Sequence, residues 1–280
     1  MLRWLLPLLA CVRIAALPQD EGTAYDGDPY HGAAGNEMSC KWTCVVFTLQ
    51  WPAAFCQSLD NASLCTIPEH VDTWTIHGLW PMKVQQCCRC WPMFFSDVQV
   101  RPLVSMFECK LGHDRRFPQE LHDALQEWWP SLLKSRSSFN FWRDEWEKHG
   151  TCAACVEGLN SPLRYFQTCL KLRGRFDLRK ALEDAGIKPS CDRPYKLSEV
   201  QDVLAPLLGH ACEIECVQDD KGREVWFQVK IRLSRNLTVG CEHAAAAADV
   251  TPISQGHPCP AQGTFYLLPI DRRRPSRPCD

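Results

Sequence analysis

Apolar residues along this chain follow two spacings, one typical of strands and one typical of helices. The clearest strand pattern lies at 225–234, where apolar and other residues alternate and predict a half-buried strand. The apolar positions on its expected inner face are Val225, Phe227, Val229, Ile231 and Leu233. Runs of β-branched and aromatic residues at 44–52 and 72–81 end in proline and predict two more strands, the second broken at Gly78. A last strand is expected at 263–270.

The helical spacing lies mostly in the middle of the chain. A helix is predicted at 119–133, with an apolar face formed by Leu121, Leu125, Trp128 and Leu132. Residues 139–150 predict a second helix that ends at Gly150, because glycine is a common C-terminal cap. Further helices are expected at 162–173, at 176–185 and at 198–208, where Ser198 is the expected N-cap. Strands and helices are mixed without a regular βαβ order, which favours an α+β fold.

The ends of the chain differ in composition from its middle. Residues 1–17 contain an early arginine, an apolar run and small residues, and predict a signal peptide, although an unusual N-terminal extension is the alternative. Residues 18–37 are expected to be a flexible lead-in to a single domain at 38–270. Within that domain, residues 97–117 lack periodicity and indicate an insertion. The basic, proline-rich residues 271–280 are expected to form a disordered tail.

Composition adds the expected compartment. Eighteen Cys are too many for a reducing cytosol and indicate secretion, to the extracellular space or a lysosomal lumen. Sequons at Asn61 and Asn236 are candidate glycosylation sites. No run outside the N-terminus reaches the roughly 20 apolar residues that a membrane span needs. The net charge of −2 gives no general attraction to nucleic acid, but nine His would make the chain positive at acidic pH and favour an anionic substrate.

Candidate chemistry is concentrated at 144–152, "DEWEKHGTC". On a helix, Glu145, Lys148 and His149 fall at i, i+3 and i+4 and share one face. That face is either a solvated surface or a catalytic one. Trp142 and Trp146 flank it and are expected to pack inward, which would hold the helix firmly.

A second histidine, His77, lies in the apolar strand predicted at 72–81. It is either a hydrogen-bonded core residue or a catalytic one. Cys87 and Cys152 each lie close in sequence to one histidine, so a bond between them would bring the two segments together. Two imidazoles beside an anion suit phosphodiester cleavage: one accepts the proton of an RNA 2′-hydroxyl and the other donates a proton to the leaving 5′-oxygen. This chemistry needs no metal and no cofactor.

The segments "WTIHGLWP" (74–81) and "EWEKHGTC" (145–152) resemble the two active-site segments of the ribonuclease T2 family. "LQWP" and "FC" upstream and "WP" after Cys90 fit the same family. The resemblance implies an α+β fold with a central antiparallel sheet packed with several helices and stapled by disulfides. It also implies a monomeric acid endoribonuclease that cleaves single-stranded RNA through a 2′,3′-cyclic phosphate to a 3′-phosphate. The alternative is a secreted relative with weak or no activity that acts by binding.

The resemblance also assigns roles to single residues. His77 would be the proton donor and His149 the base, while Glu145 and Lys148 would support the transition state. Trp80 would stack on the upstream base, and contacts to the downstream base would come from Gln50 and Phe141.

Two positions depart from the family pattern. Asp144 occupies the place of a phosphate-binding histidine, so we expect weaker phosphate binding and a more acid-dependent activity. Met82 occupies the place of an aspartate that contacts a base, which leaves the base preference open.

The resemblance suggests three disulfides: Cys56–Cys65, Cys87–Cys152 and Cys216–Cys259. Removal of a signal peptide would take Cys11 and leave an odd number of cysteines, so at least one thiol would be free or paired between chains. A zinc site at 87–90, "CCRC", is the alternative use of the clustered cysteines.

Overall fold

The computed structural model describes residues 40–59, 61–84, 87, 91–98, 117–209, 212–241 and 256–280, which belong to one compact unit. The expected signal peptide at 1–17, the lead-in at 18–37 and nearly all of the expected insertion at 97–117 lie outside these residues. Among the helices described, none has both the length and the apolar character that a membrane crossing requires.

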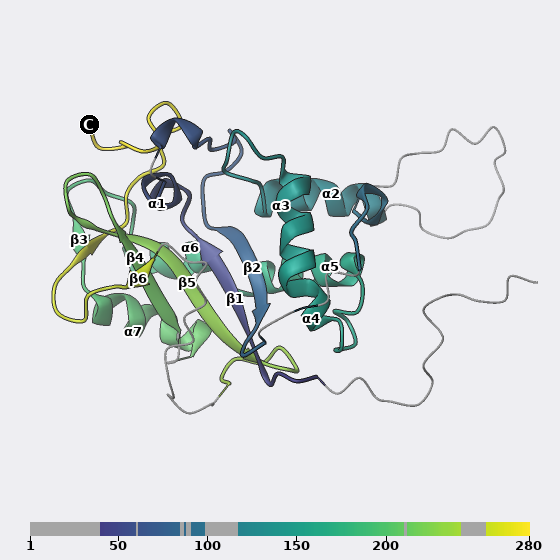
Figure 1. The fold of residues 1–280 in the computed structure, drawn as a ribbon. Helices are drawn as coiled ribbons and strands as arrows, with labels where there is room; N and C mark the ends of the chain where they lie inside the picture. Colours follow the sequence, from purple (N-terminus) through teal and green to yellow (C-terminus); the bar gives the residue numbers. More distant parts are fainter. Residues whose placement is uncertain are drawn as a thin grey trace, which may run out of the picture. The chain divides into compact units, whose positions relative to one another are not determined.

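A mixed but mainly antiparallel sheet forms the centre of the unit (Figure 1). Its strands follow the order β2-β1-β5-β4-β6, and all of these neighbours are antiparallel. The short strand β7 pairs with β3 and, in parallel, with β5. The strands are β1 (Cys44–Gln50), β2 (Thr75–Pro81), β3 (Pro194–Tyr195), β4 (Glu213–Gln218), β5 (Glu224–Ser234), β6 (His257–Pro258) and β7 (Phe265–Tyr266). The predicted α+β class is confirmed.

Every helix predicted in the described chain is present, with ends that differ by a few residues. The α-helices are α1 (Pro52–Gln57), α2 (Phe117–Trp128), α3 (Ser138–Glu145), α4 (Thr151–Ala153), α5 (Pro162–Arg175), α6 (Leu178–Asp184) and α7 (Leu197–Leu208). Short 3₁₀ turns lie at η1 (Ala62–Leu64) and η2 (Phe95–Asp97). Ser198 is not the N-cap of α7; Lys196 holds that position and Ser198 lies inside the helix. Helix α3 runs beside the edge strand β2 (Figure 1).

Strand β5 has an apolar face and a polar face, and both are buried. Its predicted inner residues, Val225 to Leu233 in alternation, are at most 3% exposed and belong to the main core. The prediction of a half-buried strand is wrong, because Trp226, Gln228 and Lys230 on the other face are also buried. The sheet therefore has a second face that is polar and covered, and this face carries the candidate site.

Six disulfides hold the described chain together. The three suggested pairs, Cys56–Cys65, Cys87–Cys152 and Cys216–Cys259, are bonded. The other three are Cys40–Cys155, Cys44–Cys241 and Cys191–Cys279. Cys169 and Cys212 are buried free thiols. The bond of Cys87 to Cys152 removes Cys87 from the alternative zinc site, while Cys88–Cys90 lie outside the described residues.

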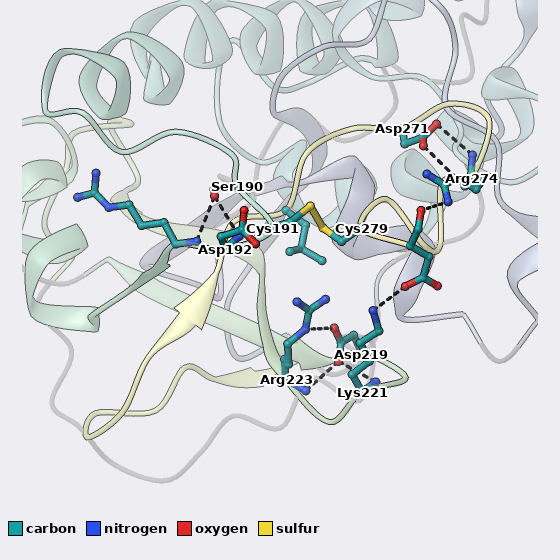
Figure 2. Close-up of a disulfide and its surroundings, with 12 residues drawn as sticks. Ser190, Cys191, Asp192, Asp219, Lys221, Arg223, Asp271, Arg274 and Cys279 are labelled. Carbon is teal, nitrogen blue, oxygen red and sulfur yellow. Dashed lines mark hydrogen bonds and ion pairs between the residues drawn. A yellow bond between two sulfur atoms is a disulfide. The ribbon is translucent and has the colours of Figure 1, made fainter.

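The prediction of a disordered tail at 271–280 is wrong for the described structure. Cys279 is bonded to Cys191, and Asp280 accepts a hydrogen bond of 2.6 Å from Lys221 (Figure 2). Arg277 lies 3.3 Å from Asp220. Figure 2 shows the Cys191–Cys279 disulfide with Lys221 near it, and Arg274 paired with Asp271. Basic residues of the tail thus pair with carboxylates close by, and the disulfide holds the tail against the unit.

Candidate active site

His77 occupies a β-bulge in strand β2. Thr48 of β1 pairs with Gly78 and the next residue, Leu49, pairs with Ile76, so His77 has no direct partner on β1. The sequence predicted that this strand is broken at Gly78. Strand β2 is instead continuous and carries one extra residue, His77, before Gly78. Trp129 Nε1 donates to the freed carbonyl of His77 over 3.0 Å, which satisfies the irregular backbone. Bulges commonly redirect a side chain near an active site.

The His77 side chain lies on the polar face of the sheet. Its Nδ1 lies 2.7 Å from Nε2 of Gln228, which is buried on β5. With the amide N–H donating to Nδ1, the proton of a neutral His77 lies on Nε2. The pKa of His77 is lowered to about 3, mainly by burial and to a smaller extent by the charges of His149 and Lys230, while the hydrogen bond with Gln228 opposes the shift. Gln228 was not predicted as a site residue.

Helix α3 does not continue as an α-helix to Gly150. It passes into a π-helix, η3 (Trp146–Gly150), and then into α4, so the predicted C-terminal cap is wrong. Gly150 has φ −60° and lies within this run, and an added Cβ there would collide with the Trp146 ring. The segment is held by indole hydrogen bonds, from Trp142 to the carbonyl of Trp129 and from Trp146 to that of Trp91. π-Turns occur often at functional sites, and this one carries His149.

Trp80 contacts both histidines. Its ring centroid lies 4.9 Å from that of His77 and 5.5 Å from that of His149. Burial lowers the pKa of His149 to about 4, with a smaller effect in the same direction from Lys148. Only 8% of Trp80 is exposed, so little of its ring is free for the predicted stacking on a base.

Glu145 is fixed behind the two histidines. Trp80 Nε1 donates to Glu145 Oε2 over 2.8 Å, and this contact fits only because residue 78 is glycine: a Cβ there would overlap both atoms. Burial raises the pKa of Glu145 to about 8, against the opposing effect of the Trp80 hydrogen bond. Glu145 is therefore a neutral acid at acidic pH. We call His77, His149 and Glu145 the histidine centre.

Beside this centre lies a group of charges open to water. Asp144 forms ion pairs with Arg136 and, over 3.4 Å, with Lys148. The exposed fractions of the side chains are 35% for Arg136, 25% for Asp144 and 44% for Lys148. We call these three residues the charged edge. Lys148 therefore pairs with Asp144, and its charge also acts on Glu145, whose pKa it lowers. Asp144 is balanced by two cations.

The remaining predicted substrate residues lie around His77. Gln50 is buried on β1, directly opposite Gln228 and Thr75 in the sheet, and its side-chain oxygen has no partner among the described residues. Phe141 is half-buried on α3, with its ring centroid 6.2 Å from that of His77. Met82 follows β2 and is half-buried. Gln50 and Phe141 therefore lie on the side of the sheet that carries His77.

Sequence reasoning missed Gln228, Arg136 and the buried pair of Lys230 and Glu215, whose charged atoms lie 2.5 Å apart. Polar residues at alternate positions of an otherwise apolar strand were a visible signal for Gln228 and Lys230. Arg136 gave no such signal, because it precedes helix α3 in an ordinary polar loop. Within the described ranges, no three His, Cys, Asp or Glu side chains are grouped closely enough to hold a metal ion. Both sequon asparagines, Asn61 and Asn236, are exposed.

Comparison with known proteins gives the same family throughout. A model of the ribonuclease T2 family matches residues 42–245. Ribonuclease T2 from Sus scrofa is 34% identical over 201 residues, which cover 70% of this chain and 87% of that protein. Ribonuclease T2 from Homo sapiens is 33% identical over 186 residues, 66% of this chain, and the match spans 63% of the human protein's own length.

Two solved structures extend the similarity to the fold. The crystal structure of human RNase T2 aligns with a TM-score of 0.56 and 29% identity, covering 81% of this chain and 100% of that chain. RNase NT in complex with 5′-AMP aligns with a TM-score of 0.62 and 25% identity, covering 81% of this chain and 98% of that chain.

Proposed function

The chain belongs to the ribonuclease T2 family, and on this basis we propose that it is an acid endoribonuclease that cleaves single-stranded RNA with two histidines and no metal. The observation that carries the proposal is the placement of His77 and His149 against the same indole, Trp80, from two different elements. General acid–base catalysis requires this arrangement of two proton-transfer groups near one substrate.

The proposed first step transfers two protons. Neutral His149 accepts the proton of the 2′-hydroxyl, whose oxygen attacks the adjacent phosphorus. The bond from phosphorus to the 5′-oxygen breaks as protonated His77 donates its proton to that oxygen. The products are a 2′,3′-cyclic phosphate and a free 5′-hydroxyl. Water then opens the cyclic ester with the two roles exchanged, which gives a 3′-phosphate and restores both histidines.

Glu145 and Lys148 would stabilise the charge that develops on the phosphoryl oxygens. Because its pKa is raised to about 8, Glu145 carries a proton at acidic pH and can donate it in a hydrogen bond to a phosphoryl oxygen. Trp80 holds this carboxyl in place from behind. Lys148 adds a positive charge from the charged edge. Phe141 and Gln50 would contact the downstream base.

The low pKa values of the histidines support an acid enzyme. The reactive state has His77 protonated and His149 neutral, while burial lowers the two pKa values to about 3 and about 4. The fraction of free enzyme in this state is therefore greatest at acidic pH. We further propose that the protein acts as a secreted or lysosomal monomer with glycans at Asn61 and Asn236, consistent with its six disulfides.

The test is cleavage of single-stranded RNA by the purified protein near pH 5 with a chelator present, repeated on His149→Ala. We expect cleavage by the wild type and a loss of at least about a hundredfold in the variant. The matched control is His70→Ala, since His70 is exposed and bonds only to the carbonyl of Gln126 among its described contacts. Abolition of activity by the chelator would contradict metal independence. Binding of RNA without any cleavage would favour the alternative of a non-catalytic binding protein.

A further inference from the structure

Arg136 pairs with Asp144, although the sequence assigned Arg136 no role. Its Nη2 donates to Asp144 Oδ2 and, over 3.3 Å, to the carbonyl of Asn140. Its Nε is buried with no partner among the described residues. One nitrogen of the guanidinium thus contacts helix α3 at Asn140 and at Asp144, while the side chain stays 35% exposed.

Asp144 places two cations side by side. Its Oδ2 contacts both Arg136 and Lys148, so three charges with a net value of one positive unit form the charged edge. Asp144 directly precedes Glu145, and the charge of Arg136 lowers the pKa of Glu145, although burial outweighs this effect. Arg136 is therefore electrostatically coupled to Glu145 of the histidine centre.

Resting on the proposed ribonuclease function, we propose that Arg136 is a substrate-binding residue whose guanidinium, anchored by Asp144, binds an RNA phosphate beside Lys148. In this arrangement Asp144 acts as a positioning residue and does not repel the substrate. The pair replaces the single histidine that the family usually carries at position 144. A guanidinium presents several donors in a fixed plane and suits phosphate oxygens.

The use of Arg136 in place of a histidine has a consequence for the pH dependence of substrate binding. A histidine at this position would lose its charge as pH rises through about 6.5, whereas arginine keeps its charge at every pH at which the protein is folded. Substrate binding through Arg136 should therefore depend less on pH than binding through a histidine would. The expectation from sequence that Asp144 makes the enzyme more acid-dependent stays a prediction, and the inference about Arg136 argues against it.

A purely structural salt bridge is the competing explanation. Exposed pairs of this kind contribute only about 0–1 kcal/mol to stability and contact no substrate. If Arg136 served only to balance Asp144, removal of both side chains would restore substrate binding. If Arg136 contacts the phosphate, the double variant binds as weakly as the single Arg136 variant.

The experiment measures binding of a short single-stranded DNA, which carries the phosphates but no 2′-hydroxyl and so is not cleaved. Affinity is followed by tryptophan fluorescence near pH 5 between about 50 and 200 mM salt, for Arg136→Gln, Arg136→Ala and the double variant Arg136→Ala with Asp144→Ala. The matched control is Arg143→Ala, which removes the same charge from an exposed residue of helix α3. Arg136→Gln keeps hydrogen-bonding capacity in case the alanine variant is unstable.

We expect Arg136→Gln and the double variant to bind about tenfold more weakly and to lose about one unit of salt dependence, while the control stays within about twofold of wild type. Wild-type affinity in Arg136→Gln, or recovery in the double variant, would overturn the inference. The outcome is separate from that of the proposed function, because a wild type that cleaves RNA together with normal DNA binding by Arg136→Gln would refute the role of Arg136 alone.

Discussion

The histidine centre and the charged edge are neighbours in sequence and space but differ in their exposure to water. The centre is packed against Trp80 and Gln228, and burial shifts the pKa of each of its members toward the uncharged form. The edge keeps three charges, with side chains 25–44% exposed. The centre should therefore respond to pH, and the edge to salt, because exposed charges are screened by ions and buried groups are screened much less.

The largest expected effect is loss of the proposed proton donor. His77→Ala should lower kcat by at least about a hundredfold, because no other described group takes the place of the imidazole next to Gln228. Substrate affinity, measured with the uncleavable DNA, should stay within about threefold of wild type, since the charged edge is intact. A large loss of affinity with kcat preserved would reverse the division of roles between the two regions.

The second effect is on the pH profile of kcat/KM, which reports the free enzyme. With pKa values of about 3 for His77 and about 4 for His149, activity should fall roughly tenfold per unit above about pH 5, as His77 loses its proton. Arg136→Gln should lower the whole profile without moving it. A wild-type profile that stays flat between about pH 5 and 7 would contradict the burial argument.

A smaller effect is expected at Gln228. Protonated His77 carries a hydrogen on Nδ1, and the Gln228 oxygen, which has no partner among the described residues, can accept it if the amide rotates. Gln228→Leu removes this acceptor and should lower kcat/KM by about tenfold, with the fall in activity shifted to lower pH. Gln218→Leu, at an exposed position of β4, is the matched control. An unshifted profile in Gln228→Leu would exclude this positioning role.

The smallest effect concerns stability at Glu145. Its pKa rises from 4.5 to about 8 on folding, so the folded protein keeps a proton that the unfolded chain releases. The resulting stabilisation is complete below about pH 4.5 and is lost as pH rises through 8. The measurement is the free energy of unfolding in urea for Glu145→Gln and wild type. Between pH 5 and 8 the difference between the two proteins should change in favour of the variant by about 1 kcal/mol per pH unit. A constant difference between the two proteins would show that Glu145 is not protonated in the folded state.

Much of the centre could be predicted from sequence because it is coded by short segments. The strand at 72–81 and the helix at 139–150 each carry one histidine, and two cysteines near them form a bond in the structure. The bulge at His77 and the π-helix could not be predicted, because both depend on distant groups: the indole of Trp129 bonds to His77, and Trp91 accepts from Trp146.

The pairing within the charged edge could not be predicted for a similar reason. Asp144 alone indicated repulsion of phosphate, but its charge is balanced by Arg136, eight positions earlier in a loop without periodicity. The tail at 271–280 shows the same limit, since its pairing through Cys279 depends on a cysteine 88 residues away. A local sequence pattern shows which charged residues are present. Whether such a charge attracts or repels a substrate depends on its partners in the fold, which the local pattern does not show.

The most direct test of the central claim uses a DNA oligonucleotide with a single ribonucleotide, incubated with the wild type near pH 5 in the presence of a chelator. If two imidazoles act on a 2′-hydroxyl, the oligonucleotide should be cleaved at one position only, directly 3′ of the ribonucleotide. Mass spectrometry should find a 2′,3′-cyclic phosphate on one fragment and a 5′-hydroxyl on the other. Cleavage at deoxyribose positions, or a fragment with a 5′-phosphate, would contradict the account.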